Sequence, residues 1–261
     1  MTSTPTQQIR ARLTGRTALV TGATSGIGEA IANALAAEGA HVVVGGRDRP
    51  RGDAIVAAIR SSGGRADFIA VDLGGSSDDI RGFATDVTRA LGGRIDILIN
   101  NAGIYPATAT ADLDDTDLEA MLAVNIRAPH VLVGQIAPAM AGRGSGCIVN
   151  VGSWMARVGN PLAAMYSATK AAEEQLTRSW AAEFGPSGVR VNTVAPGVTL
   201  TPGNEAARPI LDSMTAGTPA GVVIRPSDIA SGVLFLVSDD ATMIHGVILD
   251  VDGGISATRP A

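Results

Sequence analysis

Residues 17–28 read TALVTGATSGIG, a short apolar run followed by a turn that contains three glycines. Glycines let the backbone approach a ligand closely, and the exposed N–H groups at the start of a helix favour a pyrophosphate. An Ala-rich amphipathic segment follows from Ile27 to Glu38, and Gly39 is typical of a helix end. The spacing Gly-x3-Gly-x-Gly differs from the commonest dinucleotide fingerprint and lacks the Gly-Lys-Ser/Thr of a P-loop. Although such turns also occur as plain strand–helix connections, the stretch favours a dinucleotide site.

The rest of the chain repeats this alternation of apolar runs and helical stretches. Further strands are expected at 41–44, 68–71, 95–99, 147–151, 189–194 and 247–251, and helices at 54–60, 80–91, 125–140 and 163–184. Such alternation indicates right-handed βαβ units around a buried parallel sheet. We therefore predict a single-domain, doubly wound, Rossmann-like α/β fold with about seven parallel strands and helices on both faces. It spans residues 13–261, after a loose tail at 1–12.

Composition narrows the classes of function. With 261 residues, 46% of them hydrophobic, the chain can bury one large core. A net charge of −5 argues against a nucleic-acid or anionic membrane surface. The sequence has neither an 18-residue apolar run nor an apolar leader in its first 13 residues, so no membrane span and a cytoplasmic location are expected. Cys147 is the only cysteine and the three histidines lack ligand spacing, so no metal site is expected.

The single lysine of the chain, Lys170, lies four residues after Tyr166, one of only two tyrosines. On a helix this spacing places the phenol and the ammonium group on one face. A nearby cation stabilises a phenolate and so lowers the pKa of a tyrosine from its usual value of about 10. The pair therefore indicates a tyrosine prepared for proton transfer.

Five motifs occur in the order and approximate spacing of the short-chain dehydrogenase/reductase family, which the chain resembles from about Leu13 to Gly254. They are Thr-Gly-x3-Gly-Ile-Gly at 21–28, Asn-Asn-Ala-Gly at 100–103, Ser153, Tyr166-x3-Lys170 and Pro196-Gly197. The resemblance implies hydride transfer between a nicotinamide cofactor and a ketone or secondary alcohol. The motifs are similar to those of 3-oxoacyl-carrier-protein reductases, but sugar, steroid and polyol dehydrogenases share them.

The resemblance also implies four catalytic residues. Tyr166 is expected to be the acid/base and Ser153 to hydrogen-bond the substrate oxygen. Lys170 would assist the tyrosine and hold the nicotinamide ribose, and Asn125 would hold a water that connects Lys170 to solvent. Taken alone, Ser153 could instead be a turn or cap residue, and Asn125 the N-cap of the helix that follows it.

The cofactor contacts implied by the family fall after the ends of strands, where ligands bind in open α/β sheets. They are Gly22, Thr24, Ser25, Gly26, Ile27 and Gly28 in the turn; Asp72 and Leu73 at the adenine; Asn101, Ala102 and Gly103 at the ribose; Tyr166 and Lys170; and Pro196, Gly197, Thr199 and Thr201 at the carboxamide.

The end of the second strand bears on the choice of dinucleotide. By the family's register, Gly46 stands where NAD enzymes place an acid, and Arg47 offers a planar donor fork to a phosphate. NADP is therefore expected rather than NAD, although Asp48 could pair with Arg47 or turn toward the ribose itself.

A substrate lid is expected at about 201–220, and a mainly apolar pocket wall from Tyr105, Trp154, Met155, Val158, Leu162 and Met165. Arg157 could meet an acidic group or form a surface ion pair. By family resemblance, helices 125–140 and 163–184 and the segment 250–254 would form the interfaces of a homotetramer that acts on a small molecule. The alternatives are a catalytically silent NAD(P)-binding regulator, an isomerase or dehydratase on the same scaffold, and an NAD-dependent alcohol, sugar or steroid dehydrogenase.

Overall fold

The computed structural model describes residues 11–258 and places seven strands in one parallel sheet, in the order β3-β2-β1-β4-β5-β6-β7. The strands are β1 (Thr17–Thr21), β2 (His41–Gly46), β3 (Arg65–Ala70), β4 (Ile97–Asn100), β5 (Gly146–Val151), β6 (Val189–Pro196) and β7 (Ile248–Val251). The order reverses between β1 and β4, which creates the crevice at which doubly wound folds bind their ligands. The predicted fold class is confirmed.

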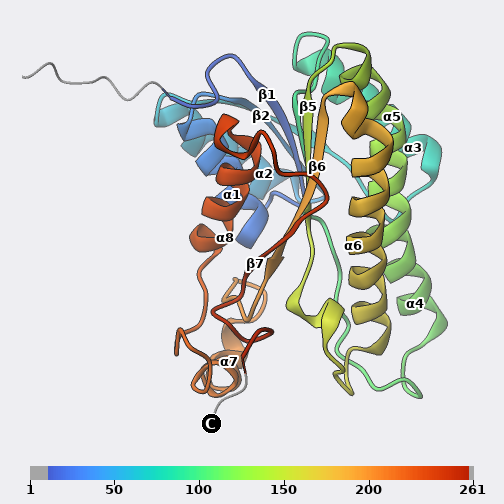
Figure 1. Cartoon of the computed structure of the whole chain (residues 1–261), viewed down its shortest axis with the longest axis vertical. Coiled ribbons are helices and arrows are strands. Elements are labelled where there is room, and N and C mark those ends of the chain that lie inside the picture. Colours follow the sequence, from blue (N-terminus) through green and yellow to red (C-terminus); the bar gives the residue numbers. More distant parts are fainter. Residues whose placement is uncertain (1–10, 259–261) are drawn as a thin grey trace, which may run out of the picture.

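Helices cover both faces of this sheet (Figure 1). On one face lie α1 (Gly26–Ala37), α2 (Arg49–Ser61) and α8 (Pro226–Val237); on the other lie α3 (Ser77–Ala90), α4 (Asp115–Leu122), α5 (Ala128–Gly142) and α6 (Ala164–Phe184). Two apolar cores result, one on each face. The inner strands β1, β2, β4, β5 and β6 are buried on both sides and rich in Val, Ile, Leu and Ala, whereas the edge strands β3 and β7 are partly exposed.

Some boundaries differ from those expected. Helix α2 begins five residues early, at Arg49, because the side chain of Asp48 accepts the Arg51 N–H and caps the helix. Strand β3 begins three residues early, at Arg65. Of the expected tail, residues 1–10 lie outside the described residues, and Arg12 forms an ion pair with Glu38 at 2.8 Å.

The helix expected at 125–140 is part of a longer helical stretch. It begins at Asp115, after the capping residue Asp114, and passes through a π-helical turn, η1 (Ala123–Arg127), into α5. Asn125 lies inside that turn, so its interpretation as a helix N-cap is wrong. Single π turns frequently mark functional sites.

The same stretch, Asp115–Gly142, is the one candidate among residues 11–258 with the length and apolar composition of a membrane span. Half of its most apolar window is buried inside the protein. Its apolar residues pack in the core that faces β4 and β5, which accounts for its hydropathy without a membrane.

The turn after β1 depends on close backbone contact. A Cβ atom at Gly28 would lie 2.4 Å from the carbonyl oxygen of Gly22 and 2.5 Å from Nδ2 of Asn101. Asn101 donates to the carbonyl oxygens of Thr21 (2.8 Å) and Gly22 (3.1 Å), so it fastens the turn to the end of β4. Position 28 therefore has no space for a side chain.

We expect Gly28→Ala to lower the free energy of unfolding by about 1–3 kcal/mol, because the added methyl group must displace backbone. Gly82 in the exposed middle of α3 is the matched control, since a Cβ atom there meets nothing within 4 Å. Gly82→Ala should be neutral or stabilising by up to about 1 kcal/mol. Chemical denaturation of both variants measures the difference, and equal stabilities would contradict the close packing of the turn.

Candidate active site

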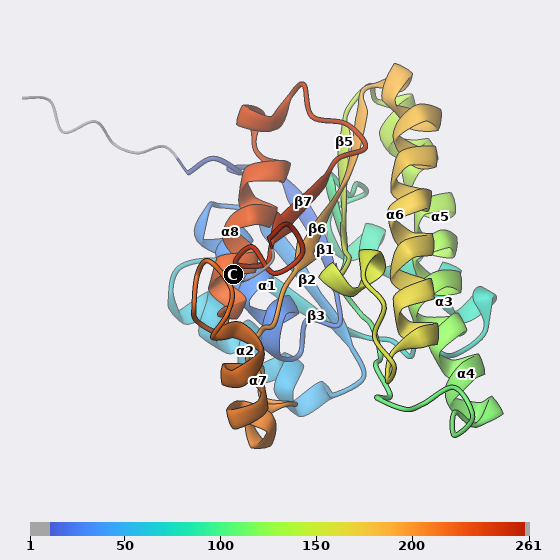
Figure 2. The same ribbon diagram turned by 60° about the horizontal axis from the view of Figure 1, so that its bottom comes forward.

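Two adjoining cavities open at the carboxyl edge of the sheet, with volumes of about 590 and 660 Å³. Figure 2 brings this edge forward, with α7 (Arg208–Thr215) on the same side as α2, and α4 on the opposite side. The cavities share Asn101, Gly103 and Ile104 from the segment after β4. We call the smaller the nucleotide cavity and the larger the reaction cavity.

The nucleotide cavity gathers predicted residues from the ends of four strands. Its lining includes Gly22, Thr24, Ser25, Arg47, Asp72, Leu73, Asn101, Ala102 and Gly103. Gly22 and Gly26 adopt φ values of +61° and +57°, a region that favours glycine. Gly28 is buried behind the turn, where its lack of a side chain permits the close contact described above. The structure thus places most of the expected cofactor residues around one space.

At the end of β2, Asp48 is paired with Arg51, a residue that the sequence analysis did not single out. Its Oδ1 accepts the Arg51 N–H at 3.0 Å, and its Oδ2 lies 3.1 Å from Arg51 Nε. Asp48 therefore pairs with Arg51 rather than with Arg47, and it also lines the nucleotide cavity. Both Arg47 and Arg51 line the cavity. The i,i+3 spacing after a helix N-cap was the signal for Arg51.

Gly46 is the last residue of β2 and lines the same cavity, and a side chain at this position would have to displace that of Thr24. A Cβ atom there would lie 2.7 Å from Cγ2 of Thr24. The end of β2 therefore presents two guanidinium groups to the cavity, and the carboxylate of Asp48 is held by one of them.

The reaction cavity contains Ser153, Tyr166 and Lys170. Ser153 is buried, and its Oγ accepts the Met155 N–H at 3.2 Å, which caps the short helix η2 (Trp154–Arg157). The cap interpretation of this serine is therefore correct as a statement of structure. Because Oγ uses an acceptor position for the cap, its hydroxyl proton remains able to donate to a ligand.

Tyr166 and Lys170 lie one turn apart on α6, as predicted, and both face the cavity. The rings of Tyr166 and Tyr105 pack together with centroids 4.6 Å apart. Tyr105 also lines the cavity, as expected, and burial, followed by the charge of Tyr166, raises the pKa of its phenol. Tyr105 thus forms a wall of the reaction cavity that packs against Tyr166.

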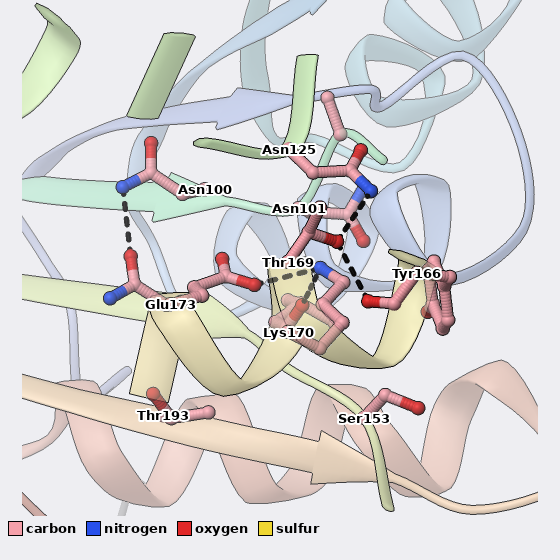
Figure 3. A network of polar contacts seen from close by, with 12 residues as sticks. Asn100, Asn101, Asn125, Ser153, Tyr166, Thr169, Lys170, Glu173 and Thr193 are labelled. Carbon is pink, nitrogen blue, oxygen red and sulfur yellow. Dashed lines mark hydrogen bonds and ion pairs between the residues drawn. The ribbon is translucent and has the colours of Figure 1, made fainter. Parts of the chain in front are cut away.

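Lys170 is buried, with its ammonium group held by two acceptors (Figure 3). Nζ donates to the Val151 carbonyl at 2.7 Å and to Oε2 of Glu173 at 2.8 Å. Burial alone would lower the pKa of Lys170, but the negative charge of Glu173 and that of a Tyr166 phenolate outweigh it, so the pKa is raised. Sequence analysis missed Glu173, because opposite charges at i,i+3 on a helix usually form a solvated surface pair.

Asn125 does not line the reaction cavity, and its side chain forms hydrogen bonds with Ile104 and Thr169 rather than with Lys170. Its Oδ1 accepts the Ile104 N–H at 2.9 Å, and its Nδ2 donates to the Ile104 carbonyl at 3.0 Å and to Oγ1 of Thr169 at 3.1 Å. Figure 3 shows it above Thr169, on the far side of Lys170 from Ser153. Asn125 therefore connects the segment after β4 to α6, and so fixes the distance between the two walls of the site.

The segment after β6 completes the reaction cavity with Pro196, Gly197, Thr199 and Thr201, together with Ile27 from the first turn. Asn204 holds this segment in shape, since its Oδ1 accepts the Thr201 N–H and its Nδ2 donates to the Thr199 carbonyl. Gly26 packs against it, because a Cβ atom there would lie 3.2 Å from Thr201 Cγ2. The expected carboxamide-binding residues thus lie beside the expected phosphate turn.

The outer wall of the reaction cavity is apolar. Trp154, Met155 and Leu162 line it from the segment after β5, and Ala207, Ile210, Leu211 and Met214 from α7 and the turn before it. Val158 and Met165, expected here from the sequence, do not line it. Arg157 points elsewhere: it pairs with Asp250 and lies 3.4 Å from Glu174. Of the two alternatives given for Arg157, the structure shows the surface ion pair.

Within residues 11–258, no group of three or more His, Cys, Asp or Glu residues is placed to hold a metal ion. Cys147 is buried in β5, where burial raises the pKa of its thiol.

Comparison with known proteins agrees with the fold and the motifs. A family model described as enoyl-(acyl carrier protein) reductase matches residues 22–256. A solved structure of a short chain dehydrogenase/reductase family protein is 45% identical, covers 95% of this chain and 100% of its own, and has a TM-score of 0.86. A putative NAD(P)-dependent gluconate 5-dehydrogenase from Beutenbergia cavernae, with bound NADP, is 37% identical, with coverages of 95% and 100% and a TM-score of 0.90.

A relative with a named alcohol substrate is also similar along its length. Cyclopentanol dehydrogenase of Comamonas sp. is 35% identical over 252 residues, which cover 94% of this chain and 99% of that enzyme. The matches extend across the turn, both cavities and the tyrosine–lysine helix. The chain therefore belongs to the short-chain dehydrogenase/reductase family, as an oxidoreductase that acts between CH–OH and C=O groups.

Proposed function

We propose that this enzyme uses NADP to interconvert a neutral, mainly apolar ketone and the corresponding secondary alcohol. The observation that carries the proposal is the reaction cavity, which contains Ser153, Tyr166 and Lys170 and has an outer wall formed mainly by apolar side chains from the segment after β5 and from α7. The similarity to cyclopentanol dehydrogenase supports a small cyclic or branched substrate.

The residues of the nucleotide cavity suit a dinucleotide. The turn presents backbone at the start of α1, where a pyrophosphate is favoured, and close approach is possible because the turn is built on glycine. Gly22, Thr24, Ser25 and Ile27 would hold the phosphates, with Gly26 and Gly28 shaping the turn. Asp72, Leu73 and residues 101–103 would hold the adenosine half and the ribose. Pro196, Gly197, Thr199 and Thr201 would hold the nicotinamide end, which when bound supplies or accepts a hydride.

NADP fits the end of β2 better than NAD. The cavity presents Arg47 and Arg51 there, Gly46 stands where an NAD enzyme would place an acid, and Asp48 is paired with Arg51. Guanidinium groups are suited to a phosphate by charge and by geometry. The NADP bound to the Beutenbergia relative agrees with this assignment.

In the reduction direction, Tyr166 would donate its phenolic proton to the carbonyl oxygen of the substrate, and in oxidation it would accept that proton. Ser153 would donate to the same oxygen, since its acceptor position is used in the cap of η2. Lys170 would keep a positive charge beside the phenol and hold the nicotinamide ribose. Asn125, in the π-helical turn, would keep a path for a water between Lys170 and solvent.

The carboxyl-edge segment 201–220 would serve as a lid over the substrate, because α7 contributes Ile210, Leu211 and Met214 to the cavity from outside the sheet. Closure would exclude water from the proton transfer. A catalytically silent regulator is disfavoured, since the serine, tyrosine and lysine meet in one cavity.

The apolar wall predicts substrate preference. Neutral ketones such as cyclopentanone should turn over with NADPH, whereas an analogue that carries a carboxylate should lose at least about tenfold in kcat/KM, since no arginine among residues 11–258 lines this cavity. Absorbance of the reduced nicotinamide follows both reactions. Turnover confined to acidic or sugar-acid substrates would contradict the assignment.

Cofactor preference is tested by titration of NADPH and NADH into the same enzyme. NADPH should bind at least about tenfold more tightly, and Arg47→Ala should reduce that ratio while leaving NADH binding nearly unchanged, because the substitution removes a charge that only the phosphate meets. Equal affinities in the wild-type enzyme would overturn the choice of NADP.

We further propose a cytoplasmic homotetramer, in which the outer faces of α5 and α6 form one interface and the segment around 250–254 the other. The support is the family's assembly and the many small residues of these helices, which permit close packing. Light scattering should give a mass near four times 26.4 kDa. A monomer mass at micromolar concentration would contradict the proposal.

A further inference from the structure

We infer that Glu173 is a positioning residue for the proton-transfer site, holding the ammonium group of Lys170 in place and setting the net charge beside Tyr166. The inference rests on the proposed role of the tyrosine–lysine pair. Glu173 follows Lys170 by three residues on α6, and its Oε2 lies 2.8 Å from Nζ. Figure 3 shows the carboxylate and the ammonium group directed toward each other along the inner face of the helix.

Burial makes this pair unlike a surface ion pair. Glu173 is 2% exposed and Lys170 3% exposed, so neither charge is solvated by bulk water. An unpaired buried charge is costly, and removal of one partner leaves the other uncompensated. The two residues therefore depend on each other in a way that exposed i,i+3 pairs do not.

The pair also directs the remaining donor of the lysine. An ammonium group has three N–H donors, and two are used by Glu173 and by the Val151 carbonyl at the end of β5. Gly103, which lines both cavities, is close on the open side: a Cβ atom there would lie 3.6 Å from Nζ. The third donor is thus left for the cavity rather than for the protein.

The charge of Glu173 acts on few other groups. Within α6 it faces Lys170 and, next to it, Glu174. The strands packed against this part of α6 present Asn100, Asn150 and Thr193, which do not titrate, and Arg157 from η2 is paired with Glu174 and Asp250. Burial raises the pKa of Glu173, opposed by the ammonium group, so the carboxylate relies on Lys170 for its charge.

Glu173 also affects the pH dependence of the reaction. Lys170 and Glu173 form one coupled pair, and its ammonium group lies one helical turn from the phenol of Tyr166. With Glu173 in place, the pair presents no net charge to the cavity. If the negative charge of Glu173 is removed, a net positive charge remains there, and nearby groups lose their protons more easily.

The test compares two neighbouring glutamates. We expect Glu173→Gln to move both limbs of the pH profile of kcat/KM toward lower pH by about one unit, because the amide retains an acceptor but not the charge. Glu174→Gln is the matched control: Glu174 is also buried on the same helix, but its carboxylate lies beside Arg157 rather than Lys170. Because Glu174 lies beside Glu173 and not beside the ammonium group, the pH profile of Glu174→Gln should move much less than that of Glu173→Gln. Profiles that coincide for all three proteins, or that move equally for both variants, would overturn the inference.

A second measurement does not depend on activity. Lys170→Met and Glu173→Gln should each lower the melting temperature, and the double variant should be at least as stable as the less stable single variant, because it contains no unpaired charge. Lys170→Met combined with Glu174→Gln should instead be additive. Additive losses of melting temperature for the Lys170–Glu173 combination would overturn the inference.

The two proposals fail in different ways. If the stability measurements show that Lys170 and Glu173 are coupled but the enzyme has no oxidoreductase turnover, only the proposed function is contradicted.

Discussion

A buried ammonium group needs acceptors for its hydrogen bonds and a counter-charge, and the active site of this enzyme is arranged around that requirement. Lys170 receives one acceptor from the end of β5 and the other, with the charge, from Glu173 on its own helix. Tyr166, one turn earlier, shares a helix face with this ammonium group. Burial lowers the pKa of Lys170, but nearby negative charge outweighs burial and raises it, so the group keeps its positive charge. The position of α6 against β5 and β6 therefore determines where Tyr166 and Lys170, the proposed proton-transfer pair, lie in the reaction cavity.

The topology of the parallel sheet brings the other residues of the two cavities together. Residues that are far apart in the chain meet because every strand delivers its following segment to the same edge. Asn101 fastens the first turn to β4, Asn125 fastens the segment after β4 to α6, and Asn204 shapes the segment after β6. Three asparagines thus fix the walls of two cavities whose own linings are mostly glycine, backbone and apolar side chains. Side-chain amides suit this task because each both donates and accepts.

Much of this arrangement was predictable from the sequence, for physical reasons. Uninterrupted apolar runs that alternate with Ala-rich helical stretches indicated a parallel sheet. A lysine four residues after a tyrosine indicated that the two side chains share one face of a helix. Three features were missed. The π-helical turn at Asn125 is a backbone irregularity without a local sequence signal, the engagement of Asp48 by Arg51 depends on where α2 begins, and Glu173 resembles a surface residue until the burial of α6 is known.

The central claim is that the phenol of Tyr166 exchanges a proton with the substrate oxygen. Single-turnover rates of Tyr166→Phe with bound reduced cofactor test it most directly, since the change removes one oxygen from a side chain that otherwise keeps its packing against Tyr105. The account predicts a rate lower by about 10²–10⁴-fold with cofactor affinity retained. A rate within a few-fold of the wild type would contradict it.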